Sequence, residues 1–527
     1  MSFSVYTAVF LCGLYLLYLV IPARVRPYLL MAASALYCRH LHEMAWFGLT
    51  VITVFVFFAG LLVDLIRVRA AGKAAPAGAG TGQAGESPAA GNRQAGKAPA
   101  AVKAAAGLGI AVVAGMLVLY KYSLPLLNSG KLTNPHMINS LIRLYFAAGF
   151  SYYSFQSISY LAEIAKGSIR AEKNPVFFAL WLSFFPKLAS GPIERPETGL
   201  SQIRSLHERP RFEPERVSEA FSWLVYGYFL KVFFADQLSG FAAMCFALPE
   251  ARSAWMLILG ALAYSAQLYA DFAGYSAIAV GAAKLFGIDL ARNFFSPYLS
   301  ANITEFWQRW HISLSSWLRD YVYIPLGGNR RGLARQCVNI VIVFLVSGFW
   351  HGSGWTFIVW GAIHAALSVA HTLWRRVLIP AVHRGSSAQA QTADKEPGPA
   401  GAVSRRAVRR AVCTALTFLA CAFAWIFFGS ADLPSAADYI RCMLTSWAVP
   451  ETYVILKSKL GVVLAGLAAV AAMDAAAYVK NAQVPELLAK CPIAVRYGFW
   501  LLAAVLIFVF GAYGTGYNAG NFIYSQF

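Results

Sequence analysis

Long apolar runs dominate the sequence and alternate with short polar connections. Most of these runs approach or exceed the length that an α-helix needs to cross about 30 Å of hydrocarbon at about 1.5 Å per residue. The apolar runs lie at 4–21, 28–41, 44–66, 105–127, 137–165, 217–248, 255–286, 336–350, 353–374, 411–428, 452–478 and 493–512. This pattern predicts an all-α, polytopic integral membrane protein with about 11–13 membrane helices.

Two stretches do not fit simple spanning helices. The run at 175–189 is short and has basic residues on both sides, and residues 287–334 mix Trp, Tyr, Arg, Asn and Gly. Irregular backbone at membrane depth is tolerated where protein or a hydrated cavity surrounds it. We therefore expect re-entrant segments around a central funnel or tunnel, and an interfacial helix at 435–447.

Two polar segments interrupt the apolar pattern. Residues 70–104 and 375–410 contain no aromatic side chain and are rich in Ala, Gly, Lys and Arg. Such segments cannot build a core, and their positive charge favours the cytoplasmic side. We expect one membrane domain over 1–527 with these two flexible cytoplasmic linkers. Counting the crossings then places both termini outside the cytoplasm, in a multi-pass protein of the cytoplasmic membrane.

Composition supports the membrane interpretation. Of the 527 residues, 58% are hydrophobic and 13% are charged, and the chain has 37 Phe and 14 Trp. The formal net charge is +20, but the basic residues concentrate in the connections between apolar runs. This distribution is typical of loops beside anionic membrane lipid and argues against nucleic acid as a partner.

The region from Asp271 to His364 carries the candidate chemistry, because it places His, Arg and Asp side chains among apolar segments. Polar groups of this kind are costly at membrane depth and are expected to line a hydrated cavity. His351 ends an apolar run in the motif S-G-F-W-H-G. A neutral imidazole can accept a proton from an alcohol that attacks an acyl carbonyl. The alternative is a buried His that a neighbouring hydroxyl satisfies. If the small residues beside His351 let a substrate approach, we expect Gly352→Trp to block transfer of the acyl group and to leave the fold intact.

The other polar residues leave more alternatives open. A helix over 305–318 would put Trp307, His311 and Ser315 on one face, either at a site or in an interfacial helix. Asp271 needs a partner, for which Arg309, Arg319 or a Tyr hydroxyl are candidates, and an ion pair and a cavity wall are both open roles. His364 and His371 are assigned to helix packing, because no Cys or acidic residue stands at metal-ligand spacing. We expect no metal site.

The motifs resemble those of the membrane-bound O-acyltransferase family. The resemblance rests on Y-A-D-F-A-G-Y-S, on F-W-Q-R-W-H-I-S-L-S-S-W-L-R-D-Y and on S-G-F-W-H-G, and it extends to F-P-K-L-A-S-G-P-I-E-R-P and the final N-F-I-Y-S-Q-F. It implies His351 and His311 as catalytic residues. The expected substrate-binding residues are Asp271, Asn302, Trp307, Arg319, Tyr323, Asn329 and Trp350.

The resemblance also implies partners. No cofactor is expected to stay bound, and the acyl donor is a thioester, either acetyl-CoA or an acyl-carrier thioester such as the one used in D-alanyl transfer to teichoic acids. The acceptor is a cell-surface polysaccharide or cell-wall polymer, reached through a separate extracytoplasmic acyltransferase. Two other classes stay open. A transporter would often show an internal repeat, which we do not see, and a scaffold would not need His351.

Overall fold

The computed structural model describes residues 5–41, 45–74, 98–128, 149–378, 399–447 and 453–511. The chain divides into two compact units. Unit 1 comprises Met1–Glu213 with Phe286–Asp289, and unit 2 comprises Pro214–Leu285 with Leu290–Phe527. All of the candidate site residues lie in unit 2. The expectation of one membrane domain over 1–527 stays a prediction.

The longer elements of unit 1 are all helices within its described residues. They are α1 (Val5–Val20), α2 (Arg26–Leu41), α3 (Ala45–Ala74), α4 (Ala100–Asn128), α6 (Phe150–Lys166), α7 (Pro175–Ser183) and α8 (Pro196–Arg204). Its interior holds an ion pair in which Lys187 Nζ lies 3.0 Å from Glu194 Oε2. The side chain of Gln156 also accepts a hydrogen bond from Lys187. A buried charge of this kind needs such partners to offset its desolvation.

Unit 2 is also helical where it is described. Its helices are α9 (Pro214–Tyr228), α10 (Asp236–Ala247), α11 (Ala254–Leu285), α12 (Ile303–Arg309), α13 (Ile312–Leu318), α14 (Leu333–His351), α15 (Trp355–Leu373), α17 (Pro399–Gly429), α18 (Leu433–Thr445), α19 (Tyr453–Lys480), α20 (Val484–Ala489) and α21 (Ile493–Phe510). A π-helical turn at Phe229–Ala235 joins α9 to α10. The predicted short helix at 435–447 corresponds to α18.

The predicted all-α, polytopic class is confirmed. No strand occurs in the described ranges, and eight of their helices are long and apolar enough to cross a membrane. These candidate spans are Trp46–Ala71, Ala100–Tyr122, Pro214–Ala247, Ala254–Leu285, Leu333–His351, Trp355–Val377, Arg405–Gly429 and Ile493–Phe510. The side of the membrane on which each loop and terminus lies stays a prediction.

Both predicted linkers are shorter than their composition suggested. Helix α3 continues to Ala74 and α4 begins at Ala100, so both ends of the 70–104 segment are helical. A π-helical turn reaches Leu378, and α17 already begins at Pro399. Ala, Lys and Arg are strong helix formers, which explains how the helices extend into segments that have no core residues. The middle parts of both linkers lie outside the described residues.

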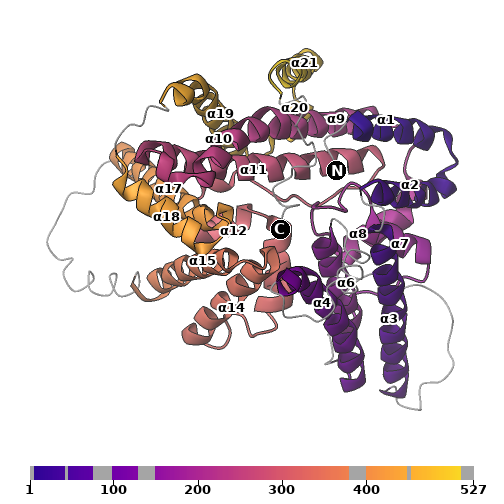
Figure 1. Ribbon diagram of the computed structural model, residues 1–527. Coiled ribbons are helices and arrows are strands. Elements are labelled where there is room, and N and C mark those ends of the chain that lie inside the picture. The colour runs from indigo at the N-terminus through magenta and orange to yellow at the C-terminus, as the bar shows by residue number, and fades with distance from the viewer. Residues whose placement is uncertain are drawn as a thin grey trace. The chain divides into compact units, whose positions relative to one another are not determined.

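Helices α14 and α15 form the hairpin that the sequence predicted around His351, and they lie side by side in Figure 1. Two glycines set their close approach. A Cβ at Gly348 would lie 2.4 Å from the carbonyl oxygen of Phe357, and one at Gly361 would lie 2.5 Å from that of Phe344. Any side chain at either position would separate the two helices. The glycines are therefore explained by helix packing.

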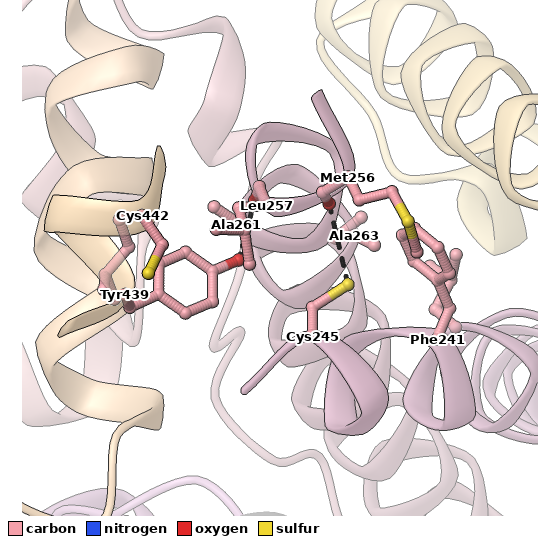
Figure 2. Packing of buried hydrophobic residues seen from close by; sticks show 11 residues of the cluster. Phe241, Cys245, Met256, Leu257, Ala261, Ala263, Tyr439 and Cys442 are labelled. Carbon is pink, nitrogen blue, oxygen red and sulfur yellow. Dashed lines mark hydrogen bonds between the residues drawn. The ribbon is translucent and has the colours of Figure 1, made fainter. Parts of the chain in front are cut away.

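An apolar cluster joins α10, α11 and α18 in unit 2 (Figure 2). Phe241 and Cys245 of α10 pack against Met256 and Leu257 of α11 within it. The hydroxyl of Tyr439 in α18 donates a 2.7 Å hydrogen bond to the carbonyl oxygen of Leu257. Because this hydroxyl is buried, its bond to α11 fixes the position of α18 as well as satisfying a polar atom.

Candidate active site

His351 is the last residue of α14 and is almost fully buried, with 4% of its surface exposed. Its imidazole is surrounded by aromatic rings. The ring centroids of Trp350, Trp360 and Phe428 lie 4.7, 5.0 and 5.3 Å from that of His351. These three aromatic rings enclose much of the imidazole and fix its position at the end of α14.

The space beside Gly352, which follows His351, is filled by a neighbouring side chain. A Cβ at this position would lie 2.2 Å from a ring carbon of Phe357. The expectation that Gly352→Trp leaves the fold intact is therefore wrong, because a Trp would displace this ring. That substitution reports on packing at the turn and cannot report on access of a substrate.

His311 lies at a break between α12 and α13. Its backbone is left-handed, with φ 44° and ψ 53°, a conformation that non-glycine residues seldom adopt. The continuous helix over 305–318 that would place Trp307, His311 and Ser315 on one face therefore does not form. The cause is Asn293, whose backbone carbonyl accepts a 2.9 Å hydrogen bond from Ile312 N and whose side chain accepts one of 2.9 Å from Ser313 Oγ.

Asn293 also orients the imidazole of His311. The Nδ1 atom lies 3.0 Å from Asn293 Oδ1, and the amide of Asn293 donates to Ser276 Oγ. With the amide oriented this way, Nδ1 is the donor and Nε2 carries the lone pair. His311 is 0% exposed and lies outside the eight candidate spans. Burial lowers its pKa to about 3, so the ring is neutral at pH 7.

The two His residues predicted as catalytic face the same indole. The ring centroid of Trp350 lies 4.7 Å from that of His351 and 6.2 Å from that of His311. Residues that are 40 positions apart in the sequence, counted from 311 to 351, are thus brought together around Trp350. The structure brings these three predicted residues together, and their roles at a site stay predictions.

Asp271 has a partner that the sequence analysis did not name. Its Oδ1 lies 2.7 Å from Lys231 Nζ, and Lys231 lies 2.8 Å from Asp236 Oδ1. The two suggested arginines are engaged elsewhere, since Arg309 pairs with Glu305 and Arg319 pairs with Asp320. The geometry favours the ion-pair role for Asp271.

Three other functional candidates were missed. Lys231 and Asp474 are charged residues inside apolar runs, and that position alone could have flagged them. Asp474 accepts a 2.7 Å hydrogen bond from the hydroxyl of Tyr269. The third, Asn293, gave no signal, because Asn is common at turns and its role depends on contacts that form only in the fold.

A cavity of about 400 Å³ opens beside the site in unit 2. Trp307, Arg319 and Tyr323, three of the predicted substrate-binding residues, contribute to its wall. Its other polar lining residues are Thr304, Gln308, Ser315, Ser316, Gln336, Ser368 and Thr372. This mixture of aromatic, apolar and hydrogen-bonding side chains is typical of a ligand-binding pocket.

The remaining candidates do not line this cavity. Asn302 caps α12, where its side chain accepts a hydrogen bond from Glu305 N. Asn329 is exposed in the turn before α14. His351 is also absent from the lining, but two rings connect it to the wall: Trp307 lies 5.9 Å from Trp360, and Trp360 lies 5.0 Å from His351.

Within the described residues, no group of three or more His, Cys, Asp or Glu side chains is arranged to hold a metal ion. The site is instead a pair of imidazoles around an indole, next to a hydrogen-bonding cavity. Residues 138–393, which include both imidazoles, the shared indole and the cavity but not Phe428 or Asp474, match the family model described as "MBOAT, membrane-bound O-acyltransferase family". This match confirms the resemblance seen in the motifs and assigns this region to that family.

Named relatives agree with the match. The chain is 46% identical over 219 residues to the "Probable alginate O-acetylase AlgI" of Azotobacter vinelandii, an alignment that covers 41% of this chain and 42% of that protein. It is 36% identical over 271 residues to the "Peptidoglycan O-acetyltransferase" of Helicobacter pylori, covering 51% and 46%. It is 28% identical over 252 residues to the "Teichoic acid D-alanyltransferase" of Bacillus subtilis, covering 46% and 61%. The chain thus spans less than half of the first two relatives.

Proposed function

We propose that this protein is a membrane O-acyltransferase that moves an acyl group, most simply acetyl, from a cytoplasmic thioester to a hydroxyl group for modification of a cell-surface polymer. The observation that carries the proposal is the placement of His351 and His311 on one indole, in the region that matches the family. A scaffold would not need two buried imidazoles there, because each loses favourable hydration without improving the packing.

The chemistry assigns a distinct role to each imidazole. The acceptor oxygen attacks the thioester carbonyl carbon while its proton passes to His351, and the carbonyl electron pair moves to the oxygen. When that electron pair returns to re-form the carbonyl, the C–S bond breaks. The thiolate then leaves and takes up the proton that His351 had accepted. His311 is neutral and fixed by Asn293, so it serves as a positioned hydrogen-bonding group at the site.

The cavity and the relatives support one choice of donor. Trp307 and Tyr323 offer faces for an extended arm, and Arg319, whose side chain is 62% exposed, lies where it can meet phosphate groups. The relatives named as O-acetylating proteins share more identity with this chain than the D-alanyltransferase does. We therefore favour acetyl-CoA over a carrier-protein thioester.

The acceptor side requires partners. The names of the relatives point to alginate, peptidoglycan and teichoic acid, all of which are polymers of the cell envelope. A polymer outside the membrane cannot enter the protein from the cytoplasm. We therefore propose that a separate extracytoplasmic acyltransferase takes the acyl group onward, and that both termini and the acceptor lie on that side.

The proposed function predicts that detergent-purified protein releases CoA from acetyl-CoA in the presence of a small alcohol acceptor. Thiol release and acetyl-ester formation, followed by mass spectrometry, are expected to rise together. D-Alanyl-carrier thioester, assayed in parallel, tests the alternative donor. If neither thioester is consumed, the protein is not the acyltransferase itself, and the transporter or scaffold readings gain support.

Replacing His311 with Ala is expected to lower turnover by about 10–100-fold, because a positioned hydrogen-bonding group contributes less than the proton acceptor. His311→Asn is the matched variant. Asn tolerates the left-handed backbone and can still bond to Asn293, so it should retain more activity than Ala. Rates with acetyl-CoA measure the effect, and wild-type turnover in the Ala variant would show that His311 only shapes the chain break.

A further inference from the structure

His364 lies in the middle of α15 and is fully buried, with 0% of its surface exposed. Five aromatic rings surround it. Their centroids lie within 6.2 Å of the imidazole, and they belong to Phe306, Trp307, Phe344, Trp360 and Trp425. Trp307 and Trp360 are nearest, each at 5.0 Å. We call these five rings the aromatic box.

His364 and two indoles of the aromatic box carry polar atoms with no hydrogen-bond partner in the described part of the chain. These atoms are Nδ1 and Nε2 of His364 and the indole nitrogens of Trp307 and Trp360. Leaving a buried polar group unpaired is costly, and a Phe in place of His364 would avoid that cost. Simple packing, the role expected from the sequence, therefore does not explain an imidazole at this position.

The aromatic box adjoins the cavity on one side and His351 on the other. Trp307 and Phe344 belong both to the box and to the cavity wall. Ser368 and Thr372, which also line the cavity, are four and eight residues after His364 and share its helix face. On the far side, Trp360 contacts both His364 and His351. His364 thus lies in a row of side chains that leads from the cavity wall at Trp307, past Trp360, to His351.

We propose that His364 binds the acyl-pantetheine arm of the thioester donor, with one imidazole N–H donating a hydrogen bond to a carbonyl oxygen of the arm. This inference rests on the proposed function for the identity of the donor. Trp307 stands between the cavity and His364, so its indole must turn aside for the arm to enter. The apolar rings then hold the methylene groups of the arm, and the imidazole supplies the polar contact that fixes how far it reaches.

Two substitutions at His364 separate this role from packing. His364→Phe keeps the aromatic shape and removes both nitrogens, whereas His364→Gln keeps a hydrogen-bond donor and loses the ring. If His364 binds the donor, the Phe variant melts at or above the wild-type temperature but binds acetyl-CoA about tenfold more weakly, as the loss of a buried hydrogen bond implies. The Gln variant melts lower but keeps its affinity within about threefold.

The experiment measures the dissociation constant of acetyl-CoA by titration calorimetry, together with turnover and melting temperature in detergent. Tyr439→Phe is the control, because it removes a buried hydroxyl from the apolar cluster of α10, α11 and α18 and should change stability alone. The inference is overturned if the Phe variant binds acetyl-CoA with wild-type affinity, or if affinity simply follows melting temperature across all variants. His364 would then be bonded to buried water. Wild-type protein that binds acetyl-CoA in a His364-dependent way without turnover refutes the proposed function only. Absence of binding by the wild type refutes both.

Discussion

Replacing His351 with Ala is expected to reduce acyl transfer by about 10²–10⁴-fold, because the acceptor hydroxyl loses the group that takes its proton. His351 lies at the end of α14 between Trp350 and Trp360. Among the residues that the structure describes, we see no other imidazole that contacts both rings. The measurement is the rate of acetyl-ester formation from acetyl-CoA by purified protein at matched amounts in detergent.

Loss of packing must be separated from loss of the base in this experiment. His351→Gln fills most of the same volume and can hydrogen-bond, but it cannot accept the proton at neutral pH, so it should be as inactive as Ala. His207→Ala is the control, because His207 is exposed and lies in unit 1. Substantial turnover in His351→Gln, with a melting temperature like that of the wild type, would exclude His351 as the general base.

Replacing Lys231 with Met is expected to destabilise the protein by about 3–5 kcal/mol, because two buried carboxylates lose their common counter-ion. The side chains of Lys231 and Asp271 are each 2% exposed, and that of Asp236 is 9% exposed. The π-helical turn that carries Lys231 also joins α9 to α10, so the loss should loosen that junction. Melting temperature and yield of folded protein in detergent provide the measurement.

The same substitution at a surface lysine gives the comparison. Lys166 pairs with Glu163 at 2.7 Å, but its side chain is 49% exposed. Exposed pairs contribute about 0–1 kcal/mol, so Lys166→Met should melt close to the wild type. Equal melting temperatures for the two variants would mean that water reaches Asp236 and Asp271 and solvates them once Lys231 is gone.

The helices were predictable because length and hydropathy decide them locally. The α14–α15 hairpin follows from two apolar runs and a glycine turn, and α11 from one uninterrupted run. The break at His311 was not predictable in the same way. Its residues have an acceptable helical pattern, and the competing hydrogen bonds come from Asn293, which is 18 residues earlier. A tertiary contact overrode the local preference.

The candidate site shows the same limit. The sequence indicated which residue types matter there, but not which residues they contact. Composition flagged His351, His311 and Asp271 because such groups are costly at membrane depth. It could not pair Asp271 with Lys231, because Arg309 and Arg319 in the same motif region looked equally suitable. Similarly, spacing showed that His364 and His371 share a helix face, but not that aromatic rings enclose the first while Thr304 bonds to the second. Partners are a property of the fold.

The short turn of the α14–α15 hairpin also bears on how the protein is made. Each helix has 19 residues, and only Gly352, Ser353 and Gly354 separate them. Two apolar helices joined so closely can partition from the translocation machinery into lipid as one unit. The imidazole of His351 then travels at the tip of the hairpin, where a polar group is cheaper to insert than at a helix centre. The residue proposed for catalysis thus occupies a place in the sequence that also suits membrane insertion.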